Sequence, residues 1–287
     1  MRVAFLGLGL IGGSLALATR SPDRHVVAWT PRGDGPRAAL AAGAIDEVAS
    51  SRHEAVQGAD LVILAAPPLE ILEHLRWLGD VRGTMARSAT VTDVASTKTA
   101  ISVAAREAGL PFVGGHPMAG LETSGFGAAD AQLFRDRPWI LTEALPGADR
   151  EVVERLALDA GARVIGMGAG DHDRAVAAIS HLPLVASAAL VETVLGVEGA
   201  AAPPDAGDAL ELAAGGWASM TRLARGDVAM ATGIAATNRD ALVDQLLAYR
   251  DRIDEWLTLL DRPEPPDADA LERRFGGARE RAGRERT

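Results

Sequence analysis

The stretch "RVAFLGLGLIGG", residues 2–13, combines a short apolar run with three glycines at the spacing GxGxxG. An apolar run that ends in glycine predicts a buried strand, and the glycines predict a tight turn into a helix. The first glycine permits the bend, the second lets a pyrophosphate approach the backbone, and the third lets helix and strand pack closely. The helix N-terminus then faces the anion. We therefore predict a dinucleotide site, with contacts from Gly7, Gly9, Leu10, Ile11 and Gly12.

The next predicted strand bears on which dinucleotide binds. Enzymes that use NAD usually carry an acidic residue at the end of this strand, where it binds the ribose hydroxyls. Here the strand ends "AWTPR", so that Thr30 occupies the acidic position and Arg32 follows. A hydroxyl and a guanidinium tolerate a 2'-phosphate, which favours NADP over NAD, although Arg32 is equally compatible with a solvated loop. The predicted cofactor is NADP or NAD.

Apolar runs alternate with helical stretches through the first half of the chain. This alternation is typical of βαβ units and predicts a Rossmann-type, doubly wound, mostly parallel α/β sheet. The expected strands are 2–9, 25–30, 60–67, 89–94, 111–115, 139–143 and 162–166. Helices are expected at 14–19, 36–42 and 70–78. We predict that this dinucleotide-binding domain covers residues 1–167.

The pattern changes after Gly166, where apolar residues recur at helical spacing and no further strand is expected. We predict an all-helical substrate and dimerisation domain over 168–261, in which Asp171 caps the first helix. Its wide apolar faces would be difficult to bury within one chain, which favours a homodimer through this half. From 262 to 287 the chain is polar and rich in arginine, which predicts a flexible tail.

Composition limits the classes of function. The 287 residues carry a net charge of -10, which argues against binding to nucleic acid or an anionic membrane. The absence of cysteine excludes thiolate metal sites and cysteine nucleophiles, and no metal site is predicted. The first 20 residues could be mistaken for a signal peptide, but the glycines at motif spacing favour a cytoplasmic enzyme.

Two further segments follow predicted strands and should meet at the carboxyl edge of the sheet, where ligands bind. "TDVASTK" contains Ser96 and Lys98, the single lysine of the chain, and "GGHPMAG" contains His116. A histidine at this edge suits general-base work because its pKa lies near neutrality. We predict that His116 takes a proton from a substrate hydroxyl, that Ser96 shares this proton, and that Lys98 fixes the loop.

The helical half contributes two further candidates. "SHLP", residues 180–183, places Pro183 inside an apolar helix, which predicts a kink with Ser180 and His181 lining a pocket. "GGWASMTR" ends in Arg222, whose guanidinium could hold a carboxylate through two hydrogen bonds. Taken singly, each of these residues is also compatible with a structural role.

Together, "GLGLIGGSLA", "DVASTK", "HPMAGLETSGF", "HDRAVAAISHLP" and "MTRLA…TNRDAL" resemble the prephenate and arogenate dehydrogenases of tyrosine biosynthesis. The resemblance extends from the first residue to about Asn238. It implies an oxidative decarboxylation in which His116, assisted by Ser96, takes the proton of the ring 4-hydroxyl while hydride passes to the nicotinamide. It also implies that Arg222 holds the side-chain carboxylate of the substrate and that His181 lines the pocket.

Three positions depart from the family pattern, and all lie in the substrate half: Leu184, Ser219 and Ala231 stand where a histidine, an aspartate and an aromatic residue are common. They leave open whether the pyruvyl side chain of prephenate or the alanyl side chain of arogenate is accepted. The alternatives are another NADP-linked oxidoreductase of small keto, imino or hydroxy acids and a non-catalytic dinucleotide sensor.

Overall fold

The computed structural model describes residues 1–121, 123–197, 199, 202–261 and 267–283. The chain forms two compact units, Met1–Leu242 and Val243–Thr287. The first unit contains both the sheet and most of the helices that follow it. The domain boundaries expected at 167 and 261 stay predictions.

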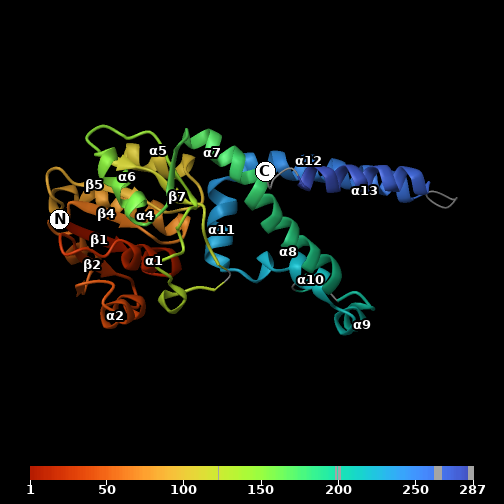
Figure 1. Ribbon diagram of the computed structural model, residues 1–287, viewed down its shortest axis with the longest axis horizontal. Helices are drawn as coiled ribbons and strands as arrows, with labels where there is room; N and C mark the ends of the chain where they lie inside the picture. The colour runs from red at the N-terminus through yellow and green to blue at the C-terminus, as the bar shows by residue number, and fades with distance from the viewer. Residues whose placement is uncertain (122, 198, 200–201, 262–266, 284–287) are drawn as a thin grey trace. The chain divides into compact units, whose positions relative to one another are not determined.

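A six-stranded parallel sheet has the order β3-β2-β1-β4-β5-β6 (Figure 1). Its strands are β1 (Arg2–Leu6), β2 (His25–Trp29), β3 (Glu47–Val48), β4 (Leu61–Leu64), β5 (Thr90–Asp93) and β6 (Phe112–Val113). The central strands are apolar on both faces because helices cover both sides of the sheet. The sequence analysis missed β3, whose two residues are too few to show a period. The predicted α/β fold is confirmed.

Two separate cores lie on the two faces of this sheet. One core joins the sheet to α1 and α6, and the other joins it to α3, α4 and α5. The helices in this part of the chain are α1 (Leu10–Ala18), α2 (Asp34–Ala41), α3 (Arg52–Val56), α4 (Pro68–Asp80), α5 (Thr99–Glu107) and α6 (Arg150–Asp159). Short 3-10 turns occur at η1 (Arg82–Thr84) and η2 (Phe126–Ala128).

A second, three-stranded sheet was not predicted. Its strands are β7 (Gly115–Pro117), β8 (Pro138–Leu141) and β9 (Arg163–Gly166), and β7 pairs antiparallel with β8. The single strand expected at 111–115 is therefore divided at Gly114 between β6 and β7. A Cβ at Gly114 would lie 2.7 Å from Thr142 Oγ1, which accepts a hydrogen bond from the Gly114 amide, so a side chain here would displace this contact. The crossing places His116 beside the carboxyl end of β5.

Helices make up the remainder of the first unit, and the described residues after Gly166 contain no strand. The elements are α7 (Ala169–Val176), the π-helical turn η3 (Ala177–His181), α8 (Leu182–Leu195), α9 (Ala206–Glu211), α10 (Gly215–Met220), η4 (Leu223–Arg225), α11 (Val228–Thr237) and the start of α12 (Arg239–Leu260). The predicted cap is wrong: Gly168 caps α7, and Asp171 lies in its first turn.

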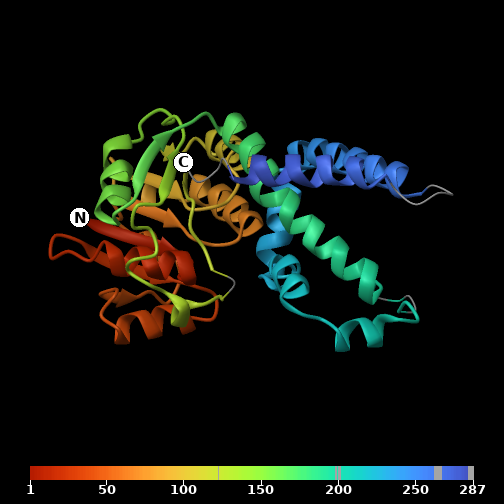
Figure 2. The same cartoon turned by 45° about the vertical axis from the view of Figure 1, so that its right-hand side comes forward.

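Helix α11 packs against α4 and α5 of the sheet region, as both cartoon views show (Figure 1 and Figure 2). A Cβ at Gly233 would lie 2.7 Å from the Pro68 ring, so the glycine permits this approach. Nearby, the hydroxyls of Thr97 and Thr237 share a hydrogen bond of 2.7 Å. These contacts fix the helices that face the carboxyl edge of the sheet.

The second unit holds the rest of α12 and a further helix, α13 (Ala268–Gly283). This helix corrects the expectation of a flexible tail over 268–283, while 262–266 and 284–287 lie outside the described residues. Asp267 begins the helix by accepting hydrogen bonds from the amides of Asp269 and Ala270. The Phe275 ring packs 4.8 Å from the ring of Trp256, which gives α13 an apolar contact.

Candidate active site

The glycine turn has the geometry that a dinucleotide needs. Gly7 has a φ of +99°, and a Cβ there would lie 2.3 Å from the carbonyl oxygen of Ala65. A Cβ at Gly12 would lie 2.9 Å from the Ala65 side chain, so this glycine allows α1 to pack on the sheet. In contrast, nothing lies within 4 Å of the Cβ position of Gly9, which begins α1. The open position is where a pyrophosphate would approach.

The end of β2 contains the two residues expected near the ribose. The Thr30 hydroxyl accepts a hydrogen bond of 3.1 Å from the Gly33 amide. Arg32 is exposed, and among the described residues no carboxylate pairs with it. The neighbouring Arg37 is bound to Asp34 at 2.5 Å. The structure thus provides an exposed guanidinium, and no carboxylate, immediately after β2.

His116 lies on β7 and is the first member of a buried chain of three polar side chains. Its Nδ1 lies 2.7 Å from Nε2 of His172. The Nδ1 of His172 lies 2.8 Å from Oδ1 of Asp173. The His116 Nε2 makes no hydrogen bond with any described residue, so this nitrogen is available to a ligand.

Backbone amides at the start of α5 anchor the end of this chain. The amides of Lys98 and Thr99 donate hydrogen bonds of 2.8 Å to the two carboxylate oxygens of Asp173. Burial by itself would raise the pKa of Asp173, but the hydrogen bonds from His172, Thr99 and Lys98 lower it overall. Asp173 is therefore an anion at neutral pH.

The pKa of His116 is lowered well below 6.5, chiefly by burial and further by the nearby His172, Lys98 and His181. The ring is thus neutral at physiological pH, which a proton acceptor requires.

Lys98 lies beneath this site and is completely buried. Its ammonium binds the Asp93 carboxylate, which also accepts hydrogen bonds from the amides of Gly115 and Ala95. Burial lowers the pKa of Lys98 and raises that of Asp93, while the ion pair opposes both shifts. Because its ammonium is paired with Asp93, Lys98 connects the loop after β5 to β7 from inside. Ser96 is half-buried in the same loop, and its role stays a prediction.

A π-helical turn, rather than a simple kink, precedes Pro183. The Leu182 amide donates to the carbonyl oxygen of Ala177, five residues earlier. His172 and His181 are nine positions apart and would face opposite sides of an uninterrupted α-helix, at about 100° per residue. Because the wide turn absorbs one residue, both histidines are buried. Ser180 is exposed, so its pocket role stays a prediction.

His181 is held by a second hydrogen-bonded side chain. The Asn238 Nδ2 lies 3.0 Å from Nδ1 of His181 and 2.8 Å from the carbonyl oxygen of Asp173. The Nε2 of His181 is buried and has no hydrogen-bond partner among the described residues. Burial lowers the pKa of His181 to about 4, so this ring is also neutral at physiological pH.

Arg222 lies in the short segment between α10 and η4, and it is exposed. This segment packs on α8, where the Ala224 amide donates a hydrogen bond of 3.1 Å to Ser187 Oγ. Ser187 is six positions beyond His181, which corresponds to about 9 Å along the helix axis. The segment that carries Arg222 and the ring of His181 are thus attached to the same helix. That they bind one ligand together stays a prediction.

Comparison with known proteins decides the family. A family model for the prephenate dehydrogenase nucleotide-binding domain matches residues 14–166, and one for the prephenate dehydrogenase dimerization domain matches residues 168–276. The chain belongs to the prephenate dehydrogenase family. It is 34% identical to the prephenate dehydrogenase of Bacillus subtilis, in an alignment that covers 97% of this chain and 74% of that protein.

Solved structures of family members agree with this assignment. The prephenate dehydrogenase of A. aeolicus, in complex with hydroxyphenyl propionate and NAD+, is similar with a TM-score of 0.84 and 26% identity; the match covers 99% of this chain and 97% of that one. The Synechocystis arogenate dehydrogenase is similar with a TM-score of 0.75 and 31% identity, covering 98% and 100%. The predictions of this family, of a dehydrogenase and of a nicotinamide dinucleotide cofactor are confirmed.

Four residues with buried hydrogen bonds in the site were not predicted from the sequence: Asp93, His172, Asp173 and Asn238. A partial signal was present, because "HD" at 172–173 begins one of the motifs that carried the resemblance. Histidine and aspartate at the start of a helix are also ordinary capping residues, which concealed their contact with His116. Asp93 and Asn238 also lie in such motifs, at the start of "DVASTK" and within "TNRDAL", but neither motif shows which atoms these side chains contact.

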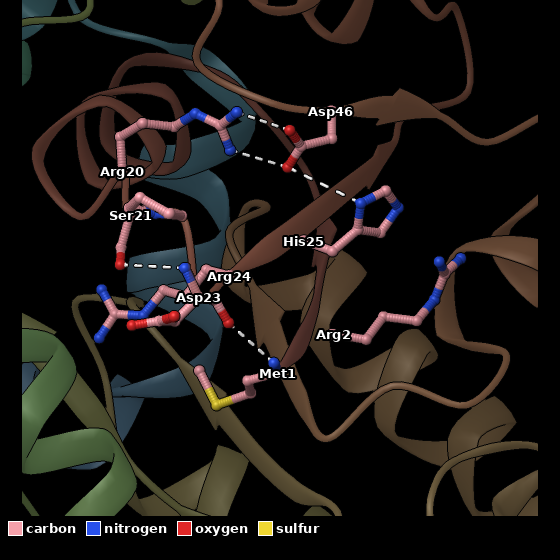
Figure 3. A pocket seen from close by; sticks show the side chains of 9 residues that line it. Met1, Arg2, Arg20, Ser21, Asp23, Arg24, His25 and Asp46 are labelled. Carbon is pink, nitrogen blue, oxygen red and sulfur yellow. Dashed lines mark hydrogen bonds and ion pairs between the residues drawn. The ribbon is translucent and has the colours of Figure 1, made fainter.

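A surface pocket lies elsewhere, at the amino ends of β1 and β2 (Figure 3). Arg20 in this pocket binds both carboxylate oxygens of Asp46, and Arg24 pairs with Asp159. These positive charges are therefore neutralised within the protein. Ligands of parallel sheets bind at the opposite, carboxyl edge, so we assign this pocket no part in the site of the dehydrogenase.

Proposed function

We propose that the protein catalyses the oxidative decarboxylation of a cyclohexadienol acid, prephenate or arogenate, in tyrosine biosynthesis. The observation that carries this proposal is His116, a neutral buried imidazole with a ligand-accessible Nε2 beside the carboxyl edge of the dinucleotide-binding sheet. A general base near neutrality is what deprotonation of the ring 4-hydroxyl requires. Family membership supplies the reaction class.

In the proposed reaction, Nε2 of His116 accepts the proton of the 4-hydroxyl as the C4–H bond breaks. The bound nicotinamide dinucleotide supplies the acceptor for the hydride. The ring carboxylate then departs as CO2, its bonding electrons complete the aromatic ring, and the 4-oxygen takes the proton back from His116 to give a 4-hydroxyphenyl product. The lowered pKa of His116 keeps the base unprotonated before each turnover. Ser96 assists at the hydroxyl in this proposal.

The substrate carboxylate on the side chain is assigned to the helical half. Arg222 can hold a carboxylate with two parallel hydrogen bonds. His181 lies at the start of α8, the helix on which the segment that carries Arg222 packs. The choice between a pyruvyl and an alanyl side chain depends on this region, where Leu184, Ser219 and Ala231 depart from the family pattern. We expect Arg222→Gln to raise KM with little change in kcat.

For the cofactor we propose a preference for NADP. Support comes from the exposed guanidinium of Arg32 and the hydroxyl of Thr30 after β2, where no acidic residue stands. A 2'-phosphate would gain a charge-assisted hydrogen bond from Arg32 and meet no carboxylate at this position.

We also propose a homodimer formed through the helical region. Residues 169–195 form a helical segment that is long and apolar enough to cross a membrane, with 22% of its most apolar window buried in the single chain. Family membership favours a different explanation, because the matching family model describes a dimerization domain. A second copy of the chain would cover this surface. The cytoplasmic location stays a prediction.

One assay tests the proposed function. The purified protein is given prephenate or arogenate with NAD or NADP, and both reduced nicotinamide and the aromatic product are measured. We expect turnover in at least one of the four pairings, and a loss of turnover of about 10²-fold or more in His116→Asn with cofactor binding retained. Four inactive pairings, or an active His116→Asn, would contradict the proposal.

A further inference from the structure

The two buried histidines of the site are both linked to one residue, Asp173, through different atoms. The carboxylate of Asp173 contacts His172, which contacts His116. The main-chain carbonyl of Asp173 contacts Asn238, which contacts His181. We propose that Asp173 is a positioning residue that fixes opposite tautomers of the two histidines, so that Nε2 of His116 accepts a proton and Nε2 of His181 donates a hydrogen bond.

The side-chain branch determines the tautomer of His116. An ionised carboxylate can only accept hydrogen bonds, so Nδ1 of His172 must carry a hydrogen. In the imidazole form of His172 the other ring nitrogen, Nε2, is the acceptor, and it lies 2.7 Å from Nδ1 of His116. The His116 Nδ1 must therefore carry the hydrogen. Its remaining nitrogen, Nε2, is left as a lone pair directed away from the chain of hydrogen bonds.

The main-chain branch determines the tautomer of His181. A carbonyl oxygen only accepts, so the amide group of Asn238, and not its oxygen, must face Asp173. The same amide nitrogen lies 3.0 Å from Nδ1 of His181, which must accept. The hydrogen of His181 is therefore on Nε2, the nitrogen that is buried without a partner among the described residues. An unpaired buried donor costs free energy, which a ligand oxygen would recover.

The result is a site with one acceptor and one donor of the same residue type. Resting on the proposed function, the acceptor meets the ring 4-hydroxyl and the donor meets an oxygen of the substrate. The amides of Lys98 and Thr99 fix the Asp173 carboxylate, so the arrangement is set before substrate binds. The π-helical turn contributes by turning His181 to the side that His172 occupies.

Histidine ¹⁵N NMR of the full-length protein without ligands tests the inference directly, because protonated and unprotonated ring nitrogens resonate far apart. The six histidines are assigned by single substitutions. We expect one tautomer at each site residue, with hydrogen on Nδ1 of His116 and His172 and on Nε2 of His181. A wild-type spectrum with hydrogen on Nε2 of His116, or on Nδ1 of His181, would overturn the proposal without any variant.

Two variants separate the branches. Asp173→Asn changes only the side chain, so the tautomers of His172 and His116 should become mixed while His181 keeps its own. Asn238→Ala should do the reverse. Asp171→Asn is the matched control, because it removes the same charge from the exposed side of α7, where Asp171 pairs with Arg174. Unchanged spectra of His172 and His116 in folded Asp173→Asn would contradict the assignment.

Kinetics provide a second readout. We expect Asp173→Asn to lower kcat by about 10²- to 10⁴-fold with little change in KM, as for a residue that orients a catalytic histidine. Asp171→Asn should retain wild-type values. If the wild-type protein turns over neither substrate yet shows the predicted tautomers, the proposed function fails and the inference about Asp173 stands. If the wild-type protein is active but shows a different tautomer pattern, the inference about Asp173 fails and the proposed function stands.

Discussion

Strand β1 and helix α8 are both strongly apolar, yet the single chain buries them very differently. Four of the five residues of β1 are buried, whereas Ser187 is the buried residue among the fourteen of α8. Beyond α8, Val228 at the start of α11 is 78% exposed. The sheet region thus buries its apolar surface within the single chain, whereas the helical region leaves much of its apolar surface exposed there. The polar network of Asp173 lies where the two regions meet.

The largest effect should come from breaking the buried ion pair of the sheet region. Lys98→Met leaves the Asp93 carboxylate buried without its counter-charge, which costs about 3–5 kcal/mol of unfolding free energy. Urea denaturation measures the loss. The double variant Lys98→Met with Asp93→Asn should recover much of it, and Arg174→Met, from an exposed pair, should change little. If Lys98→Met and Arg174→Met lowered the unfolding free energy equally, burial would not explain the difference between the two ion pairs.

The next effect concerns the helical region. Val228→Glu should weaken the dimer by at least about 10-fold in Kd, since removing one buried valine side chain costs about 1.5–3 kcal/mol and a symmetric dimer loses two. Analytical ultracentrifugation measures this change, and cofactor binding should remain as in the wild type. Leu40→Glu, on α2 of the sheet region, is the control and should leave the dimer intact. A monomeric wild-type protein would refute the comparison itself.

Two glycines of one motif should behave differently. Gly12→Ala places a Cβ against Ala65 and should lower the unfolding free energy by about 1–3 kcal/mol. Gly9→Ala meets no protein atom within 4 Å, so stability should be retained while cofactor affinity falls. Thermal unfolding and titration with the dinucleotide separate these outcomes. A Gly9→Ala variant that binds cofactor normally would remove this glycine from the phosphate site.

The last effect is a pH dependence of stability, which is small near neutral pH and grows as the pH falls. The folded protein holds His181 neutral down to about pH 4, whereas the unfolded chain protonates it near 6.5. The unfolded state therefore binds more protons in this interval, and unfolding free energy should fall as the pH drops from 6.5 towards 4. His181→Gln should reduce this slope in urea denaturation. The slope should not vanish, because the pKa of His116 is lowered as well.

Sequence reasoning predicted the parts of the fold that depend on short-range signals. The glycine spacing after residue 6 predicted the strand, the turn and the start of α1, because Gly7 and Gly12 stand where a side chain would collide with Ala65. The division at Gly114 could not be predicted, since it depends on Thr142, which is far away in the sequence. Asp267 is a typical N-cap residue and could have indicated helix α13. The many charged residues after it favoured the prediction of a flexible tail instead.

The site was predicted in the same uneven way. His116 was predicted as the base because an imidazole among glycine and proline after a strand is unusual, and the structure places it in a buried chain of polar side chains. Its orientation depends on His172 and Asp173, whose contacts arise only when α7 meets the start of α5. Arg222 was predicted to bind the substrate carboxylate. Its side chain is exposed in the single chain, and the KM of Arg222→Gln tests this role.

The wide turn at Ala177–His181 also ties the active site to the surface of α8. Closing this turn into an ordinary α-helix with every residue retained would rotate everything downstream by about 100°. His181 would leave the site in the same step that turned the apolar flank of α8 away from its present direction. The orientation of the His181 ring and the direction of the apolar α8 surface are therefore both set by one turn within a single helical segment.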